Sequence, residues 1–281
     1  MRVLIYTNTL RDPEFTLTLK TADIFRDCSC EVLLSVPAEK LCQSHTYKTA
    51  DSSDTDFDII ISLGGDGTIL SISQFAALHD IPILGINLGH LGFMTEIEQD
   101  ELHFLPRLAS GDYTLIERIR LTASVIRQGR VIFESDALND AVISKGEISR
   151  MIPITIDSDS NTIAKLTCDG VIIATPTGST AYSMSAGGPI VEPTAHNFII
   201  TPICAHTYRA GSIVLSSERL VGINLGDLEN RAANLSLDGG DSFRLESFDT
   251  VRIARSKYHT DLIKLKDHSF YDTLKSKLSN V

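Results

Sequence analysis

Residues 58–68 read DIIISLGGDGT, and this stretch decides the fold of the first part of the chain. The apolar run Asp58–Leu63 is short and unbroken, which is typical of a strand buried on both faces of a parallel sheet. Glycines end the run, and a segment with helical character follows at Thr68–His79. A strand, a glycine turn and a helix in this order predict one unit of a doubly wound α/β sheet.

The residues around this stretch repeat the same alternation of strand and helix. An amphipathic helix is expected at Phe15–Asp27, whereas the polar segment His45–Asp56 is expected to be a loop. The other predicted strands of this region are Arg2–Thr7, Glu31–Val36 and Pro82–Ile86. We therefore expect an N-terminal α/β domain with a doubly wound parallel sheet over residues 1–112.

The pattern changes after Gly111, where helical periodicity nearly disappears. Short β-type segments separated by Gly, Asp, Asn and Ser turns predict an all-β, sandwich-like domain over residues 113–254. The predicted strands are Ile119–Arg127, Val131–Glu134, Ala141–Ser144, Pro153–Asp157, Thr162–Leu166, Val171–Ala174, Phe198–Pro202, Ser212–Leu215, Ala233–Leu237 and Thr250–Ala254. The helical segment Phe270–Leu278 is expected to pack back on the first domain, so that residues 255–281 complete it.

Composition and charge restrict the classes of protein to which the chain can belong. Its 281 residues are 43% apolar and 22% charged, which is ordinary for a globular protein. A formal net charge of −11 argues against a nucleic-acid partner, because sequence-independent binders need a basic surface. We also expect no membrane partner and a cytoplasmic location. The start of the chain reads as a strand rather than a signal peptide, and the cysteines have no zinc-site spacing.

The loop Gly64-Gly65-Asp66-Gly67-Thr68 is the strongest chemical signal. Glycines let a ligand approach the backbone closely, and free N–H groups at a helix start favour an anion such as phosphate. Thr68 is expected to cap the helix. Open α/β sheets bind ligands at the carboxyl ends of their strands, where Asp66 is predicted to lie. The alternative is a plain glycine turn with Asp66 as a cap.

Two further segments are candidates for ligand contact. Thr175–Ser183 (TPTGSTAYS) is rich in hydroxyls, and its apolar and small-residue flanks favour a packed, ligand-contacting element over a solvated loop. Asn139-Asp140 sets an amide and a carboxylate between apolar residues, which is costly unless both find partners. In isolation a turn or bulge is the simpler interpretation of that pair. Asp169-Gly170 is ambiguous in the same way, and Asp238–Asp241 (DGGD) is most simply a hairpin turn.

Taken in order, these motifs resemble those of the NAD kinase family. GGDGT is shared with diacylglycerol and sphingosine kinases, whereas TPTGSTAYSMSAGGP at Thr175–Pro189 is far more specific. The resemblance spans Val3 to Asp241. Its other matches are Gly89–Phe93 (GHLGF), Asn139-Asp140, Ser149-Arg150-Met151, Cys168-Asp169-Gly170 and Thr201–His206 (TPICAH), and its departures are at Thr167, Ala210-Gly211 and Gly240.

The resemblance implies an α/β domain joined to a β-sandwich domain, with the active site between them, and a homo-oligomer (dimer or tetramer) whose neighbouring subunit often completes the site. It implies phosphoryl transfer from ATP or polyphosphate to the 2′-hydroxyl of the adenosine ribose of NAD, giving NADP, with a divalent metal ion, expected to be Mg²⁺. Two alternatives remain: a lipid kinase of the diacylglycerol or sphingosine type, and a non-catalytic NAD-binding protein.

The residue roles implied by the resemblance are carried over by position, and no metal ligand is assigned. Asp66 resembles the general base. Thr177 and Thr180–Ser185 resemble the wall of the NAD pocket. The full set of implied nucleotide contacts is Gly64, Gly65, Gly67, Thr68, Phe93, Asn139, Asp140, Arg150, Thr167, Asp169, Ala174, Thr177, Thr180, Ala181, Tyr182, Ser183 and Ser185.

Overall fold

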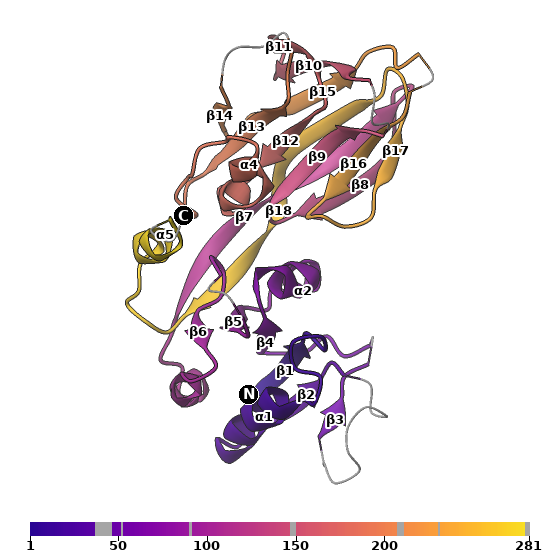
Figure 1. Ribbon diagram of the computed structural model, residues 1–281. Coiled ribbons are helices and arrows are strands. Elements are labelled where there is room, and N and C mark those ends of the chain that lie inside the picture. Colours follow the sequence, from indigo (N-terminus) through magenta and orange to yellow (C-terminus); the bar gives the residue numbers. More distant parts are fainter. Residues whose placement is uncertain are drawn as a thin grey trace. The chain divides into compact units, whose positions relative to one another are not determined.

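The computed structural model divides into two compact units (Figure 1). It describes residues 1–36, 47–51, 53–89, 92–146, 150–206, 211–229 and 231–278. The α/β unit comprises Met1–Glu117 with Thr260–Val281, and the sandwich unit comprises Arg118–His259. Strands β7 (Thr114–Arg127) and β18 (Thr250–Lys264) each contribute residues to both units.

The α/β unit is built on a parallel sheet with the strand order β3-β2-β1-β4-β5. Both β6 and the end of β18 pair with β5 in parallel. The order reverses between β1 and β4, so the carboxyl ends of these two strands form the switch point of the sheet. The bounds are β1 Arg2–Thr7, β2 Glu31–Leu34, β3 Lys48–Thr49, β4 Ile59–Gly64, β5 Ile83–Asn87 and β6 Ile97–Glu98.

Helices α1 and α2 follow β1 and β4, as the alternation predicts. All residues of β4 are buried, and Ile61 and Leu63 share one core with Phe25 of α1. The predicted α/β fold is confirmed. The helical segments of this unit are α1 Thr16–Asp27, α2 Asp66–His79, η2 Leu102–Phe104, α3 Pro106–Ala109 and α5 Phe270–Leu278.

The sandwich unit contains two sheets that share one core. One has the order β11-β10-β15-β18-β7-β8, and the other has the antiparallel order β14-β13-β12-β9-β16-β17. Val125 and Ile154 of the first sheet join the same buried cluster as Ile143 and Ile173 of the second. The predicted sandwich is therefore confirmed. The remaining strands are β8 Arg130–Ala137, β9 Asp140–Lys145, β10 Ile152–Ser158, β11 Asn161–Cys168, β12 Gly170–Ala174, β13 Asn197–Ile203, β14 Ile213–Ser216, β15 Val221–Leu225, β16 Ala233–Leu237 and β17 Phe243–Leu245.

Several elements differ from the sequence expectation. The predicted loop His45–Asp56 contains β3, and β15 and β17 were not predicted, because such short strands carry little periodicity. β18 continues well past the predicted end at Ala254, since its last part joins the core of the α/β unit through Ile263. Short helical turns, η3 (Thr177–Thr180) and α4 (Tyr182–Ser185), occupy a region where no helix was expected.

Two further observations concern cysteines and helix length in the described part of the chain. Cys28, Cys30, Cys168 and Cys204 are free thiols, whereas Cys42 lies outside the described residues. No helix among the described residues has both the length and the apolar character needed to cross a bilayer.

Candidate active site

The glycine loop lies at the switch point of the α/β sheet. β4 ends at Gly64 and α2 begins at Asp66, while Thr7 at the end of β1 pairs with Leu63. Asn8, directly after β1, donates its backbone N–H to the Leu63 carbonyl (2.9 Å) and its side-chain amide to Thr68 Oγ1 (3.2 Å). The loop is thus fixed between the carboxyl ends of two neighbouring strands, where open α/β sheets bind their ligands.

Thr68 helps to cap the following helix, as predicted, although it does not occupy the N-cap position. α2 begins at Asp66, so the capping position belongs to Gly65 and Thr68 lies inside the first turn. Thr68 Oγ1 accepts a hydrogen bond from the Gly65 N–H (3.4 Å), and the Thr68 N–H donates to the Gly65 carbonyl (2.9 Å). A Cβ atom at Gly64 would lie 2.0 Å from Thr68 Oγ1, so only glycine at this position leaves room for the Thr68 side chain. The helix therefore starts earlier than the sequence suggested.

The Asp66 carboxylate is held by the backbone of a neighbouring turn. Its Oδ2 accepts the Phe93 N–H (2.7 Å) and its Oδ1 accepts the Met94 N–H (2.9 Å). Gly92 makes this approach possible, because a Cβ atom there would lie 2.1 Å from Asp66 Oδ1. Each carboxylate oxygen has a second lone pair, so a carboxylate fixed in this way can still accept a hydrogen bond from a ligand hydroxyl.

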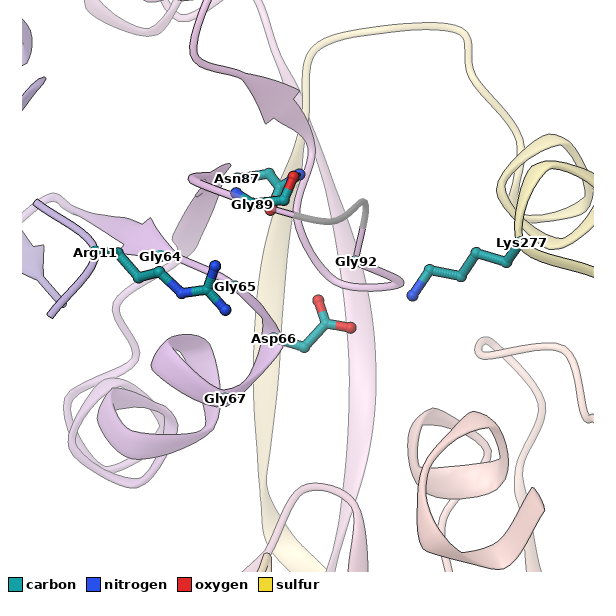
Figure 2. A pocket seen from close by; sticks show the side chains of 9 residues that line it. All are labelled: Arg11, Gly64, Gly65, Asp66, Gly67, Asn87, Gly89, Gly92 and Lys277. Atoms are coloured by element: carbon teal, nitrogen blue, oxygen red, sulfur yellow. Dashed lines mark hydrogen bonds between the residues drawn. The ribbon is translucent and has the colours of Figure 1, made fainter. Parts of the chain in front are cut away.

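A cavity of about 270 Å³ opens in front of Asp66 (Figure 2). Its wall is largely glycine backbone, and at Gly65 and Gly67 an added Cβ would meet nothing within 4 Å. Exposed backbone N–H groups at the start of a helix suit an anion. The lining residues are Arg11, Gly64, Gly65, Asp66, Gly67, Asn87, Gly89, Gly92 and Lys277.

A buried amide fixes one wall of this cavity. Asn87, the last residue of β5, is 1% exposed and donates to Glu98 Oε2 (2.9 Å) and to the Gly89 carbonyl (3.1 Å). Its own Oδ1 accepts the Gly89 N–H (3.1 Å). His90 and Leu91 of the GHLGF motif lie outside the described residues.

In the sandwich unit, the structure brings Asn139, Asp140 and the hydroxyl-rich loop together. Asp140 pairs with Ala174 between β9 and β12, and the Thr175 N–H donates to the Asn139 carbonyl (2.8 Å). A Cβ atom at Gly178 would lie 2.1 Å from that same carbonyl oxygen. The loop is therefore a packed element, as predicted, rather than a solvated one.

Two buried polar atoms in this cluster have no hydrogen-bond partner in the described structure: Asn139 Oδ1 and Thr177 Oγ1. Asn139 is 7% exposed and Thr177 is 6% exposed. Leaving a buried polar group unpaired costs free energy, so such groups normally have a partner. Both atoms belong to the same cluster and are free to bond to a polar ligand.

Asp238 holds the backbone of the Asn139-Asp140 pair. Its carboxylate accepts the N–H groups of Leu138 (2.8 Å), Asn139 (2.7 Å) and Asp140 (3.1 Å). The predicted hairpin turn is confirmed, with positive φ angles at Asp238 and Gly239 between β16 and β17. The prediction that this segment is simply a turn was incomplete, because Asp238 also positions a candidate site residue.

Burial raises the pKa of Asp140 to about 7, and the nearby negative charge of Asp238 adds to the shift. Burial also raises the pKa of Asp238, but its three backbone donors and the charge of Arg120 oppose that effect. The Asp140 carboxyl is therefore the group of this pair that holds a proton more readily.

The raised pKa of Asp140 predicts a specific dependence of stability on pH. An unfolded Asp has a pKa near 3.9, so the native state binds a proton that the unfolded state releases between about pH 4 and pH 7. The stabilisation that this extra proton gives the native state is fully present below pH 4 and is lost as the pH rises through 7. Across this range we expect the free energy of unfolding of the parent to fall by roughly 1 kcal/mol per pH unit relative to that of Asp140→Asn. Urea denaturation of both proteins at pH 5, 6 and 7 measures the difference, and parallel curves would contradict it.

Other predicted contacts lie at the opposite end of β12. Asp169 precedes this strand and Thr175 follows it, which separates them by roughly 20 Å at the rise of a β-strand. Asp169 forms an ion pair with Lys145 (2.7 Å). Thr167 lines a separate cavity of about 360 Å³, and Arg150 is exposed. Within one chain, the structure therefore does not group these residues with Asn139.

The rest of the predicted NAD wall is partly engaged in the fold. Ser183 Oγ is buried and bonds to Thr201 Oγ1 (3.0 Å), and Thr180 Oγ1 donates to the Thr177 carbonyl (3.3 Å). Ala181 is half-buried, whereas Tyr182 and Ser185 are exposed. Ser149 and residues 207–210, including Ala210, lie outside the described residues.

Family comparison agrees with the sequence motifs across both units. The ATP-NAD kinase N-terminal domain matches residues 10–113, and the ATP-NAD kinase C-terminal domain matches residues 138–265. The chain belongs to the ATP-NAD kinase family. The resemblance inferred from the motifs is thereby confirmed.

Individual relatives of this family match over most of their length. The NAD kinase of Symbiobacterium thermophilum is 46% identical over 225 residues, which cover 80% of this chain and 79% of the relative. The NAD kinase of Caldanaerobacter subterraneus subsp. tengcongensis is 38% identical over 280 residues, or 99% of each chain.

Two solved structures resemble this one. A NAD kinase from Archaeoglobus fulgidus in complex with ATP has a TM-score of 0.78 at 26% identity, with 100% of both chains covered. The yeast NADH kinase complexed with NADH has a TM-score of 0.87 at 23% identity, covering 99% of this chain and 87% of that one. The latter likeness concerns the fold.

Several residues of these sites were missed in the sequence, among them Arg11, Asp238 and Lys277. Arg11 lies shortly after the first predicted strand and lines the cavity. Residues after the carboxyl ends of parallel strands share one edge of the sheet, and this rule could have identified Arg11. Asp238 was read as a turn residue, because its contacts with residues 138–140 span about a hundred positions of sequence. Lys277 carries no local signal, since only the packing of α5 brings it to the cavity.

Proposed function

We propose that this chain is an ATP-dependent NAD kinase that phosphorylates the 2′-hydroxyl of the adenosine ribose of NAD to give NADP. Membership of the ATP-NAD kinase family supports the reaction. The observation that carries the proposal is the cavity at the switch point, where Asp66 faces a wall of glycine backbone. A lipid kinase of the GGDGT type is not favoured, because the family match extends through the sandwich unit.

The proposed role of Asp66 is that of general base. A ribose hydroxyl is a poor nucleophile at neutral pH, and a carboxylate within hydrogen-bond reach accepts its proton as the new bond to phosphorus forms. The N–H groups of Phe93 and Met94 hold the carboxylate in one orientation for this step. Phosphoryl transfer needs mainly positioning and charge stabilisation, which the Gly67 N–H and the partial positive charge at the start of α2 would supply to the phosphates.

A divalent metal ion, which we propose to be Mg²⁺, fits the donor set of this cavity. Mg²⁺ is usually held by one or two carboxylates together with substrate phosphates and waters. Asp66 is the one carboxylate among the residues that line the cavity, so the phosphate oxygens of the donor would supply most of the other ligands. The ion would neutralise charge on the transferring phosphoryl group.

We further propose that the sandwich unit holds the NAD. The unpaired oxygens of Asn139 and Thr177 support a polar ligand at this cluster, which also includes Asp140, Ala174 and the Thr180–Ser185 segment. The separation of Thr167, Asp169 and Arg150 from this cluster favours their contact with NAD bound to another subunit of a homodimer or homotetramer. We also propose a cytoplasmic location. We further propose that the chain has two functional domains: residues 1–112 together with 255–281, and residues 113–254.

Asn139→Ala tests the NAD cluster directly. The substitution removes the unpaired amide oxygen, and we expect NAD affinity to fall by about 1–3 kcal/mol in titration calorimetry if that oxygen binds the ligand. Asn161→Ala, at the exposed start of β11 in the same unit, is the matched control and should bind NAD as the parent does. Equal affinity of Asn139→Ala and the parent would remove Asn139 from the site.

The activity itself is tested with the purified full-length chain. The protein is incubated with NAD, Mg²⁺ and either ATP or inorganic polyphosphate, and NADP formation is followed with an NADP-specific dehydrogenase. Formation of NADP with ATP is the expected result, and the polyphosphate arm determines whether that donor is also used. Binding of NAD without turnover in either arm would identify a non-catalytic NAD-binding protein instead.

A further inference from the structure

Two cations reach the Asp66 cavity from segments far from the glycine loop (Figure 2). Arg11 lies in the turn that follows β1, and Lys277 lies on α5 near the other end of the chain. No ion pair joins either side chain to a carboxylate of the residues that the structure describes. Their charges are therefore available to a ligand in the cavity.

The backbone around Arg11 is anchored on both sides. The Arg11 N–H donates to the Asn8 carbonyl (3.0 Å), and Asn8 in turn is bonded to β4. The next residue, Asp12, is buried, and its carboxylate accepts the Thr18 N–H (2.8 Å) in the first turn of α1. A Cβ atom at Gly89 would lie 2.5 Å from Arg11 Nη1, so the guanidinium lies against glycine backbone at the cavity wall. Arg11 is exposed, but its backbone is anchored and its guanidinium lies against the glycine wall of the cavity.

Lys277 is held at the cavity through Phe93. Its Nζ lies 4.3 Å from the centroid of the Phe93 ring, and the ring of Phe270, also on α5, lies 6.0 Å from the same ring. Phe93 is the residue whose N–H binds the Asp66 carboxylate. One aromatic side chain therefore links α5 and its ammonium group to the turn that orients the proposed base.

The charges in the cavity favour an anion with several negative charges. Its lining holds two cations against the single carboxylate of Asp66, and the N-terminus of α2 adds a partial positive charge. The chain as a whole has a formal net charge of −11, so the excess of positive charge in the cavity is opposite in sign to the charge of the chain. A volume of about 270 Å³ is below the range of a typical drug-sized ligand site, which matches a phosphate chain better than a whole nucleotide.

We propose that Arg11 and Lys277 bind the phosphate chain of the phosphoryl donor, and that Lys277 makes α5 part of the donor site. This inference rests on the proposed kinase function. The planar guanidinium of Arg11 suits paired phosphate oxygens, while the ammonium group of Lys277 acts as a point charge. Neither side chain takes part in proton transfer, so both are binding residues whose loss affects the donor more than the NAD.

Steady-state kinetics with Arg11→Gln and Lys277→Met tests the assignment. Methionine keeps an apolar chain against Phe93 while it removes the charge, which limits the disturbance of α5. We expect KM for ATP to rise about 10-fold or more in each variant, with KM for NAD within about twofold of the parent. Lys277→Arg should restore most of the loss, and Lys275→Gln, on the exposed side of the same helix, should match the parent.

Calorimetry with inorganic tripolyphosphate separates this inference from the proposed reaction, because it requires no turnover. We expect the parent to bind tripolyphosphate and the variants to bind it at least 10-fold more weakly, with a shallower dependence on salt concentration. Unchanged tripolyphosphate affinity in both variants would overturn the inference even if the protein makes NADP. Equal rises of KM for ATP and NAD would also overturn it. If the variants lose tripolyphosphate binding but the parent never makes NADP, the inference stands and only the kinase proposal is contradicted.

Discussion

Asp66→Asn is expected to lower kcat by about 10²–10⁴-fold, the usual contribution of a positioned general base. Asparagine keeps the size of the side chain but accepts a proton far more weakly. It also has one acceptor oxygen for the two N–H groups of Phe93 and Met94, so one of these donors loses its partner. We therefore expect a loss of stability of about 1–3 kcal/mol beside the larger loss of activity.

The kinetic and structural effects of Asp66→Asn are separated by measuring kcat at saturating ATP and NAD per folded molecule, together with Tm. Asp249→Asn is the matched control, because Asp249 is a fully buried carboxylate that accepts the Glu246 N–H (2.8 Å) outside the cavity. The control should lower Tm and keep kcat. If Asp66→Asn behaves like the control, Asp66 is a turn residue and the proposed mechanism is wrong.

Asp238→Ala is expected to lower the free energy of unfolding by about 2–4 kcal/mol. The substitution leaves three backbone N–H groups without an acceptor, and each such bond contributes roughly 1 kcal/mol net. It also removes a countercharge from Arg120, which is 1% exposed. Alanine in the left-handed conformation of position 238 adds strain.

Urea denaturation measures this loss, and two further variants define its origin. Asp238→Asn tolerates the left-handed conformation and keeps one acceptor, so an intermediate loss is expected. Asp241→Ala, at an exposed position of the same turn, should unfold as the parent does. Similar stabilities for all three variants would show that the contacts of Asp238 do not support the Asn139-Asp140 segment. NAD affinity should fall in the order of the stability losses.

The parts of the fold that were predicted correctly are those whose signals are local. The unbroken apolar run before Gly64 and the glycines after it lie within a few residues of one another, so β4, the loop and α2 could be read directly. The start of α2 was misplaced because it depends on how Thr68 packs beneath Gly64, which is a contact in three dimensions. The fold and the family are confirmed, whereas the roles of the site residues stay predictions.

The parts of the site that were missed depend on distant pairs of residues. The carboxylate of Asp238 meets residues 138–140 only because β16 pairs with β9 in one register. Lys277 reaches the cavity only because α5 packs against Phe93. Periodicity and turn signals within a short window contain no information on either arrangement, although each arrangement decides which atoms face a ligand.

The α/β unit is discontinuous in sequence, since Thr260–Val281 joins it after the whole sandwich unit has been made. Domains tend to fold as they leave the ribosome, so the nascent chain finishes its second unit before its first. Until the end of β18 has been synthesised, part of the edge of β5 has no parallel strand beside it. An unpaired strand edge of this kind can pair with the wrong strand. Lys277 is translated after every other residue that lines the Asp66 cavity, which therefore gains its second cation only after the rest of its lining has been synthesised.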